Sequence, residues 1–365
     1  MTKFNTCNIC VMNSTADNII FDSNGQCNYC KKFKKKINLL KKQNHNLEKL
    51  IKKIKLQNKI NNYDCIVGLS GGIDSSYTLV KVVESGLKPL AVHMDNGWNS
   101  ELAQNNIGNL VRSLNVDLFT YVIDWEEYKK MMRSFFHSDV IDVELLMDNA
   151  MLAVNYQQAS SHKIKYILGG TNTASEGMAM PPNMNWFKYD KKNIVDIIST
   201  FGNNQIKTYP IIGTFDLVRF ILFKRIKWIS FLDYFKYNKF ESTKILSERY
   251  NFKPYPYKHY ESIFTRFYQG YILPKKFGID KRILHLSTLI ISDQISRNDA
   301  INQLENSDPY PSEEMLKEDK DYFLTKMEWT EEDLNEYIKR PEKKHNSYKS
   351  EKFIFDYLLK IYKIL

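Results

Sequence analysis

The sequence predicts an α/β protein: a parallel sheet with helices on both faces, preceded by a four-cysteine module and followed by a mostly helical C-terminal region. Between residues 64 and 199, short apolar runs alternate with helical patterns, as in repeated strand–helix–strand units. Past residue 211 this alternation fades, and mostly helical patterns continue to the C-terminus. We therefore expect three regions, spanning residues 1–62, 63–235 and 236–365.

The composition indicates a globular protein with a substantial core, because 43% of the 365 residues are hydrophobic. A formal charge of +10 is compatible with nucleic-acid binding. The lysines are spread evenly, as on a solvated surface, so we do not expect a nucleic-acid partner. We find no signal segment and no uncharged run of membrane-spanning length, and we expect a cytoplasmic protein.

Four of the five cysteines form two Cys-x-x-Cys pairs: Cys7, Cys10, Cys27 and Cys30. This spacing predicts a zinc site in which thiolates close all four tetrahedral positions, so its role is structural. Two incidental pairs, or a redox or iron–sulfur site, are the alternatives. The lysine-rich segment 31–60 has apolar residues near helical spacing, and we expect one or two amphipathic helices there, broken around 44–46.

The apolar run 65–69 predicts a buried strand, and a glycine-rich turn, Ser70-Gly71-Gly72, follows it. A helical pattern then runs from residue 73 to about 84. This arrangement presents backbone N–H groups and a helix N-terminus to a phosphate. It is not a Walker loop, which would need a lysine that is absent here. A tight turn without a ligand is the alternative.

Further strands are expected at 90–94, 118–123 and 166–169, and a last one at 227–232; helices are expected at 101–114, at 125–156 and from about 215. Ligands of open parallel sheets lie beyond the carboxyl ends of the strands. His93 and Met94 are therefore expected near an adenine or ribose, although His93 could equally be a packed strand residue. Three carboxylates on the helix 125–156 are expected to be mostly solvated and receive no role: Asp139, Asp142 and Glu144.

The motif Ser-Gly-Gly-x-Asp-Ser resembles the PP-loop of ATP pyrophosphatases, which include GMP, NAD and asparagine synthetases. This resemblance implies the fold of adenine nucleotide α-hydrolases (HUP) and the cleavage of ATP to AMP and pyrophosphate. In this resemblance Ser70, Gly71, Gly72, Ser75 and Ser76 hold pyrophosphate, and Asp74 helps to hold magnesium. Our full set of candidates for the nucleotide site is Gly68, Leu69, Ser70, Gly71, Gly72, Asp74, Ser75, Ser76, His93, Met94, Gly170 and Thr171.

A second glycine turn follows the strand at 166–169, and its Gly-Thr-x4-Glu sequence resembles the corresponding turn of NAD synthetases. The resemblance implies that Thr171 meets the nucleotide and that Glu176 meets magnesium. A Mg²⁺ ion that keeps most of its waters needs one or two carboxylates in addition to phosphates, and Asp74 and Glu176 would supply them. Glu176 as an ordinary loop residue is the alternative. The loop 178–185 is expected to cover the site.

Residues 255–267 and 273–282 interleave cations with aromatic side chains, which suits a sugar carboxylate or a nucleic acid. The charged tail 313–350 is expected to be peripheral. Together with the cysteines and the PP-loop, this block resembles the N-acetyl sugar amidotransferases of surface-polysaccharide and pseudaminic or legionaminic acid pathways. The resemblance covers residues 7–311, most of the chain.

This family resemblance implies that an acetamido group of an acidic sugar becomes an acetamidino group. ATP would form an O-adenylyl imidate, ammonia would displace AMP, and the cofactors would be ATP, Mg²⁺ and Zn²⁺. Candidates for substrate binding are Lys258, His259, Glu261, Arg266, Lys276 and Arg282. Candidates for catalysis are Asp74, Lys258, His259 and Glu261. For each residue of the substrate-binding group, an ordinary surface or core-bordering position is the alternative.

The sequence offers no nucleophile for a glutaminase of its own. Thr2 stands where an N-terminal cysteine would be needed, and Cys65 lies inside the first strand. We therefore expect glutamine hydrolysis on another polypeptide, and the resemblance suggests a glutaminase subunit and a barrel subunit that channels ammonia. One alternative function is a tRNA-modifying PP-loop enzyme, although thiolation usually needs further cysteines near the PP-loop. The other is a zinc-ribbon binding module with a decayed nucleotide fold, which is disfavoured because both phosphate turns are complete.

Overall fold

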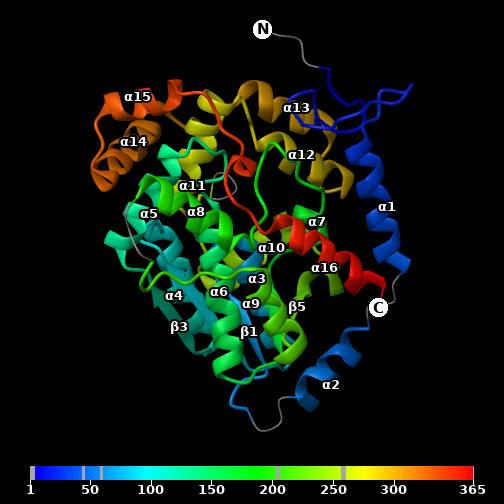
Figure 1. The fold of residues 1–365 in the computed structure, drawn as a ribbon. Helices are drawn as coiled ribbons and strands as arrows, with labels where there is room; N and C mark the ends of the chain where they lie inside the picture. Colours follow the sequence, from blue (N-terminus) through cyan, green and yellow to red (C-terminus); the bar gives the residue numbers. More distant parts are fainter. Residues whose placement is uncertain (1–4, 43–45, 58–60, 203–205, 256–259, 365) are drawn as a thin grey trace.

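The centre of the protein is a five-stranded parallel sheet with the strand order β3-β2-β1-β4-β5. The computed structural model describes residues 5–42, 46–57, 61–202, 206–255 and 260–364. Figure 1 shows the sheet in the lower half of the molecule, with most of the C-terminal helices above it. All five predicted strands are confirmed: β1 (Cys65–Gly68), β2 (Pro89–Asp95), β3 (Leu118–Val122), β4 (Tyr166–Gly169) and β5 (Lys227–Ser230).

Both faces of β1 are buried, as a parallel sheet covered by helices requires. Cys65 and Val67 face one core cluster, which includes Leu79 and Val80 of α3 (Ile73–Glu84). Ile66 faces the other cluster, together with Val154 of α6 (Leu145–Ser161). The alternation of side chains along the strand thus places α3 and α6 on opposite faces of the sheet.

The connections of the sheet carry the remaining helices of the α/β region. Capping residues set several of their starts: Ser100 accepts a hydrogen bond from the N–H of Ala103, and Asp124 accepts one from that of Glu127. Asn115 ends its helix in the left-handed conformation. These helices are α4 (Glu101–Leu114), α5 (Trp125–His137), α7 (Thr173–Glu176), α8 (Lys191–Phe201), α9 (Thr214–Val218), the π-helix η1 (Arg219–Phe223) and the 3₁₀ helix η2 (Phe231–Tyr234).

The single helix expected at 125–156 is wrong, because the chain leaves α5 at residue 138 and enters α6 at residue 145. Asp139 has a φ of 56°, which an α-helix cannot accommodate. The expectation that three carboxylates of this segment are solvated is also wrong, because Asp139, Asp142 and Glu144 are buried. Their cationic partners include Lys276 and Lys281, which lie far away in the sequence.

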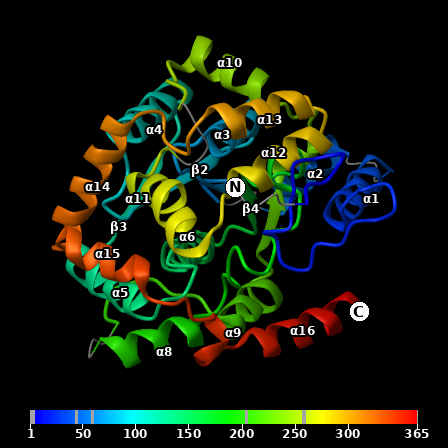
Figure 2. The same ribbon diagram turned by 90° about the horizontal axis from the view of Figure 1, so that it is seen from above.

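The N-terminal module packs on the C-terminal region. Its last cysteine, Cys30, lies in the first turn of α1 (Asn28–Lys42), and α2 (Leu47–Gln57) follows. These two helices agree with the predicted break, although residues 43–45 lie outside the described part. Figure 2 shows α1 beside α12 (Arg282–Ile291). The loop expected to cover the nucleotide site instead packs here, through Met178 and Met184 against the cysteine cluster.

The C-terminal region is mostly helical, as predicted, and no helix among the described residues is long and apolar enough to cross a membrane. The expectation that 313–350 is peripheral is wrong, because Phe323 and Tyr337 are fully buried in the cluster around Trp98. The region's remaining elements are α10 (Lys239–Tyr250), α11 (Ile263–Phe267), the π-helix η3 (Tyr268–Phe277), α13 (Arg297–Asn306), α14 (Glu313–Met327), α15 (Glu331–Lys339), the 3₁₀ helix η4 (His345–Ser347) and α16 (Lys352–Ile364).

Candidate active site

The glycine turn after β1 has the geometry of an anion site. Gly71 has a φ of +84°, a conformation that favours glycine, and α3 begins directly afterwards at Ile73. The N-cap residue, Gly72, provides no side-chain cap, and the first N–H groups of a helix have no partner within the helix. The hydroxyls of Ser70 and Ser75 lie 3.1 Å apart within the turn. These donors suit a pyrophosphate.

The second turn lies directly against the first. A Cβ atom at Gly170 would stand 2.8 Å from the backbone nitrogen of Ser75, which is why only glycine fits at the end of β4. Asn172 and Ser175 donate side-chain hydrogen bonds of 3.3 and 3.2 Å to the carboxylate of Asp74. Since β1 and β4 are neighbours at the point where the strand order reverses, the turns meet where ligands of such sheets bind.

Two carboxylates share a neighbour at this junction. The hydroxyl of Tyr237 donates a hydrogen bond to Asp74. Burial first, and then the charges of Asp74 and Glu176, raise the pKa of Tyr237 far above its ordinary value, so the phenol stays a neutral donor. Glu176 and Thr171 are solvent-exposed at the mouth of the turn. Two carboxylates beside a phosphate cradle fit a hydrated Mg²⁺.

His93 has partners within the protein at both ring nitrogens. Its Nδ1 lies 2.8 Å from the carbonyl oxygen of Leu69, and its Nε2 accepts a hydrogen bond of 3.1 Å from Asn99. Burial lowers the pKa of His93, which keeps the ring neutral. The structure thus favours the packed alternative for this residue, in which the ring fixes the end of β1.

Other residues that were predicted to contact the nucleotide pack against other parts of the protein. Gly68 faces α6, where a Cβ atom would stand 3.0 Å from the side-chain oxygen of Asn155. Ser76 is fully buried in α3, and Met94 is partly buried against the core. Among the predicted phosphate residues, Ser70, Gly71, Gly72 and Ser75 form the turn itself.

A cavity of about 350 Å³ joins the PP-loop to the C-terminal region. Asp74 of the PP-loop lines it, and so do the predicted residues Arg266 and Arg282 of the C-terminal region. The wall also contains residues that the sequence reasoning did not select: Tyr260, Gln269 and Lys281. The interleaving of cations with aromatics predicted that this block forms a site, but it did not single out these three.

Three cations of the cavity wall, on Arg266, Lys281 and Arg282, are each paired with a carboxylate. Arg266 forms a two-point ion pair with the buried Asp319, with both N–O distances at 2.5 Å. Arg282 pairs with Asp280, which also lines the cavity. Lys281 lies 2.8 Å from the buried Glu144, which also accepts two hydrogen bonds from Gln269. The cationic wall is therefore rigid before any ligand binds.

Lys276 does not belong to this wall, contrary to the prediction that it binds substrate. Its side chain is fully buried, and its ammonium group donates to Asp139 and to the carbonyl oxygens of Tyr337 and Arg340, at 2.6 to 3.0 Å. All three donors of the ammonium group are used within the protein. Lys276 is thus a structural cation that binds η3 to the end of α15.

Two further candidates, Lys258 and His259, lie outside the described residues. Glu261 lies at the PP-loop, because a Cβ atom at Gly72 would stand 3.1 Å from its carboxylate oxygen. Tyr255, from the same segment, donates a hydrogen bond of 2.9 Å to the carbonyl oxygen of Gly71. Tyr255 and Glu261, on either side of this gap, therefore both lie against the glycine turn.

The four cysteines form a cluster whose ligand atoms all lie within 4.8 Å of one another. The sulfur atoms of Cys7 and Cys30 are 3.8 Å apart, and those of Cys10 and Cys27 are 3.9 Å apart. A tetrahedron with metal–sulfur bonds of about 2.3 Å has edges of about 3.8 Å, so the arrangement fits a thiolate-bound metal.

The protonation of these sulfurs is coupled. Hydrogen bonds with Cys10 and Cys30 lower the pKa of Cys27 to about 2, whereas the hydrogen bond to Cys10 raises the pKa of Cys30 far above its ordinary value. The four sulfur atoms thus lie close enough to shift one another's pKa. Four thiolates together need a cation, which a divalent metal supplies.

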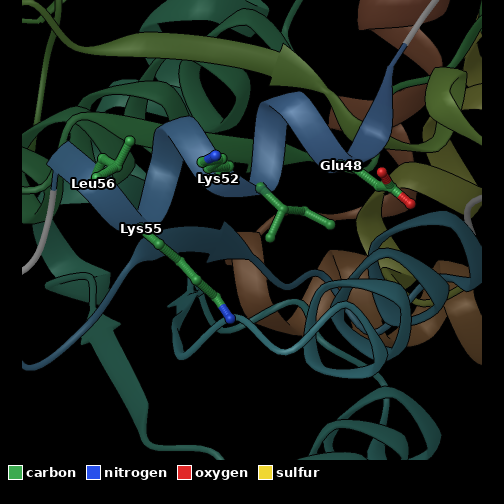
Figure 3. Close-up of a pocket in the computed structure, with 5 residues that line it drawn as sticks. Glu48, Lys52, Lys55 and Leu56 are labelled. Carbon is green, nitrogen blue, oxygen red and sulfur yellow. The ribbon is translucent and has the colours of Figure 1, made fainter.

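A second hollow, of about 480 Å³, lies along α2 and is shown in Figure 3. It is lined by Glu48, Ile51, Lys52, Lys55 and Leu56. The ammonium group of Lys55 approaches Gly86, just beyond the end of α3 that is opposite to the PP-loop. This hollow therefore lies away from the nucleotide turns.

Two family models match the chain. Residues 43–180 match NAD synthase, and residues 261–362 match the C-terminal domain of WbpG-like LPS biosynthesis proteins. Together with the sheet and its two turns, the first match indicates an ATP-using enzyme with a domain of the PP-loop superfamily. The second confirms the resemblance to amidotransferases of polysaccharide biosynthesis within that superfamily, and an ATP-using fold of this kind implies ATP and Mg²⁺.

Several solved structures are similar to the chain, at low sequence identity and low TM-score. NMN synthetase from Francisella tularensis is 14% identical and has a TM-score of 0.30; the match covers 63% of this chain and 99% of that chain. NH3-dependent NAD synthetase from Campylobacter jejuni is 16% identical and has a TM-score of 0.29; the match covers 47% of this chain and 72% of that chain. The U34-tRNA thiolase NcsA from Methanococcus maripaludis, with its [4Fe-4S] cluster, is 13% identical and has a TM-score of 0.31; the match covers 88% of this chain and 89% of that chain. These values say nothing about activity. No curated protein matches the chain.

Proposed function

We propose that the protein is an ATP-dependent amidotransferase that converts an acetamido group of an acidic N-acetyl sugar into an acetamidino group. One observation carries this proposal: a single cavity joins Asp74 of the PP-loop to the cationic wall of the WbpG-like region. A sugar in that cavity would have its anionic group near Arg266 and Arg282. Its amide oxygen would then point toward the nucleotide.

The chemistry follows from the weakness of an amide as an electrophile. The acetamido oxygen attacks the α-phosphorus of ATP, so that an oxygen–phosphorus bond forms and pyrophosphate leaves. Ammonia then attacks the carbon of the O-adenylyl imidate, and AMP leaves with the former amide oxygen. Loss of a proton from the added nitrogen completes the acetamidino group, which takes up a proton in water.

The residues of the two turns would stabilise the departing pyrophosphate. N–H groups of the first turn of α3, with the hydroxyls of Ser70 and Ser75, would donate to the oxygens on which its charge develops. Asp74 and Glu176 would hold Mg²⁺, which supplies neutralising charge on the phosphates. Glu261 lies beside Gly72 and is our candidate for accepting a proton from ammonia, together with His259, while Lys258 would bind the sugar.

We also propose zinc at the four cysteines and a cytoplasmic location, where ATP and nonulosonic-acid precursors such as those of pseudaminic or legionaminic acid are available. A separate glutaminase subunit and a barrel subunit would supply ammonia. The isolated chain should then use ammonium, best at a pH that gives free ammonia, and should use glutamine only with these partners added. Release of glutamate by this chain alone, at the rate of AMP formation, would contradict the partner proposal.

The structure favours this function over tRNA thiolation. Cys65, which is the cysteine outside the metal cluster, is fully buried in β1, and burial raises the pKa of its thiol well above the ordinary value. A buried neutral thiol is poorly suited to sulfur transfer. Retention of RNA in a salt-sensitive manner by the purified protein would reverse this preference.

The test of the reaction follows the oxygen atom. The chain is incubated with ATP, Mg²⁺, ammonium and acidic N-acetyl sugars whose acetamido oxygen is ¹⁸O. We expect an amidine product and AMP that carries one ¹⁸O, both measured by mass spectrometry. Unlabelled AMP with an amidine product would contradict the O-adenylyl imidate, and AMP without any amidine would contradict the amidotransferase.

A further inference from the structure

The four-cysteine module is attached to the helix that forms one wall of the cavity. The guanidinium group of Arg297, at the start of the following helix α13, donates hydrogen bonds to the carbonyl oxygens of Cys7 and Cys10, at 3.0 and 3.1 Å. The N–H of Val11 donates one of 3.2 Å to the hydroxyl of Ser287 in α12. These contacts join residues that are more than 270 positions apart in the sequence.

Helix α12 has two buried faces with different neighbours. Leu284, Ser287 and Ile291, spaced by three and four residues, face the module. Arg282, His285 and Leu289, with the same spacing, line the cavity. Because an α-helix of ten residues behaves as a short rigid rod, a shift of the module would move the cavity wall with it.

The module also holds the turn that carries Glu176. The ammonium group of Lys36, in α1, donates a hydrogen bond of 3.3 Å to the carbonyl oxygen of Gly177. The ring of Phe33 packs so closely on Gly177 that a Cβ atom there would stand 2.5 Å from it. Gln294, which follows α12, donates a hydrogen bond of 2.9 Å to the carbonyl oxygen of Ala174. One small module thus contacts both sides of the proposed site.

We propose that metal binding by the four cysteines positions α12, through Ser287 of α12 and Arg297 of α13 as positioning residues. With α12 it would position the cationic wall of the cavity, here called the acceptor wall because the acceptor sugar would bind there. Residues 7–30 form a segment too short to build a large core, so the metal would supply much of its folding free energy. The shape of the module, and therefore the placement of α12, then depends on the metal. The part of this proposal that concerns the acceptor rests on the proposed function.

Hydrogen exchange on the full chain tests the mechanical part without any reaction. The protein is compared as purified, after removal of metal by a chelator, and after zinc is added back. We expect amides of 282–291 to exchange roughly tenfold faster or more without metal, and those of 73–84 in α3 to keep their protection. Added zinc should restore both the metal content and the protection.

Kinetics of single substitutions test the link to the acceptor. Ser287→Ala removes one bond to the module and should raise the KM for the acceptor about fivefold, the equivalent of one hydrogen bond, while the KM for ATP stays within about twofold. Arg297→Ala removes two bonds and should have the larger effect, and Arg297→Lys, which can keep one of them, an intermediate one. Arg249→Ala, at the exposed end of α10, is the control and should change neither constant.

Three outcomes would overturn the proposal. Equal loss of protection in α3 and α12 would make the metal a general support of the fold. An acceptor KM that is unchanged in both Ser287→Ala and Arg297→Ala would remove their positioning role. If hydrogen exchange of residues 282–291 is unchanged after the metal is removed, metal binding and α12 are not coupled. If no acetamido sugar is converted, the proposed function fails, but the exchange experiment still decides whether metal and α12 are coupled.

Discussion

The nucleotide turns and the acceptor wall line the same cavity but consist of different kinds of groups. The first turn consists largely of backbone groups and two hydroxyls within seven consecutive residues, 70–76, and the second turn lies against it. The acceptor wall consists of side chains fixed by distant partners. Arg266 depends on Asp319, 53 residues away, and Lys281 depends on Glu144, 137 residues away.

This difference predicts two kinds of response to mutation. A change in the turns alters charges that act directly on the reacting phosphates, and it leaves the core in place. A change in the buried ion pairs of the acceptor region leaves an uncompensated charge, which costs stability before it costs chemistry. The experiments below test this division, from the largest expected effect to the smallest.

The largest effect is expected for Asp74→Asn. The substitution keeps the shape of the side chain but removes a charge beside the proposed Mg²⁺, so AMP formation should fall roughly a thousandfold or more, about 4 kcal/mol, at nearly unchanged thermal stability. Glu176→Gln should act in the same direction. Tyr237→Phe, which removes only the hydroxyl that donates to Asp74, is the milder control. Near-normal turnover in both carboxylate variants would disprove the magnesium assignment.

Lys276→Met should instead destabilise the fold. It leaves Asp139 buried with one cationic partner fewer, and we expect a loss of about 3 kcal/mol in the free energy of unfolding, measured with urea. The acceptor KM of the protein that remains folded should be unchanged. Lys275→Met, at the adjacent exposed position, is the matched control and should stay within about 0.5 kcal/mol. If the variant is stable but has a raised KM for the acceptor, Lys276 binds substrate as first predicted.

Gly170→Ala tests the contact between the two turns. The new methyl group would stand 2.8 Å from the nitrogen of Ser75 and push the turns apart, so ATP affinity should fall roughly tenfold or more, about 1.4 kcal/mol, as measured by calorimetry. Gly108→Ala, in α4, is the control because its methyl group would meet only a flexible arginine tip at 3.7 Å. That variant should gain up to about 1 kcal/mol of stability. Normal ATP affinity in Gly170→Ala would contradict the close packing of the turns.

A smaller effect is expected from pH. Burial lowers the pKa of His345 to about 4, so the folded protein keeps this ring neutral while the unfolded chain protonates it near pH 6.5. Stability is therefore lost as the pH falls from about 6.5 toward 4. The loss from this residue between pH 7.5 and pH 5 should be about 2 kcal/mol.

The measurement compares the pH dependence of urea unfolding in the wild type and in His345→Gln. The variant lacks the titrating ring, so the stability difference between the two proteins should narrow by about 2 kcal/mol at pH 5. His162→Gln, at an exposed position, should follow the wild type. A constant difference between the wild type and His345→Gln would show that His345 does not stay neutral in the folded protein.

The sequence alone determined the features that depend on local chemistry. The strand, the Gly71 turn and the helix start at Ile73 follow from residues that are adjacent in the chain, because backbone conformation and helix capping are decided within a few positions. The same holds for the spacing of the four cysteines, which two short turns bring together. The alternation of apolar runs determined the parallel sheet and its five strands.

Only the tertiary structure decided which charged side chains face the cavity. Arg266, Lys276 and Arg282 look alike in the sequence, but Lys276 is buried with Asp139 whereas the two arginines line the cavity wall. The module's attachment to α12 through Ser287 and to α13 through Arg297 could not be predicted from the sequence either. The physical reason is that the energy of an ion pair or a packed contact depends on distance in space, and local sequence patterns carry no record of partners that lie 50 to 290 residues away.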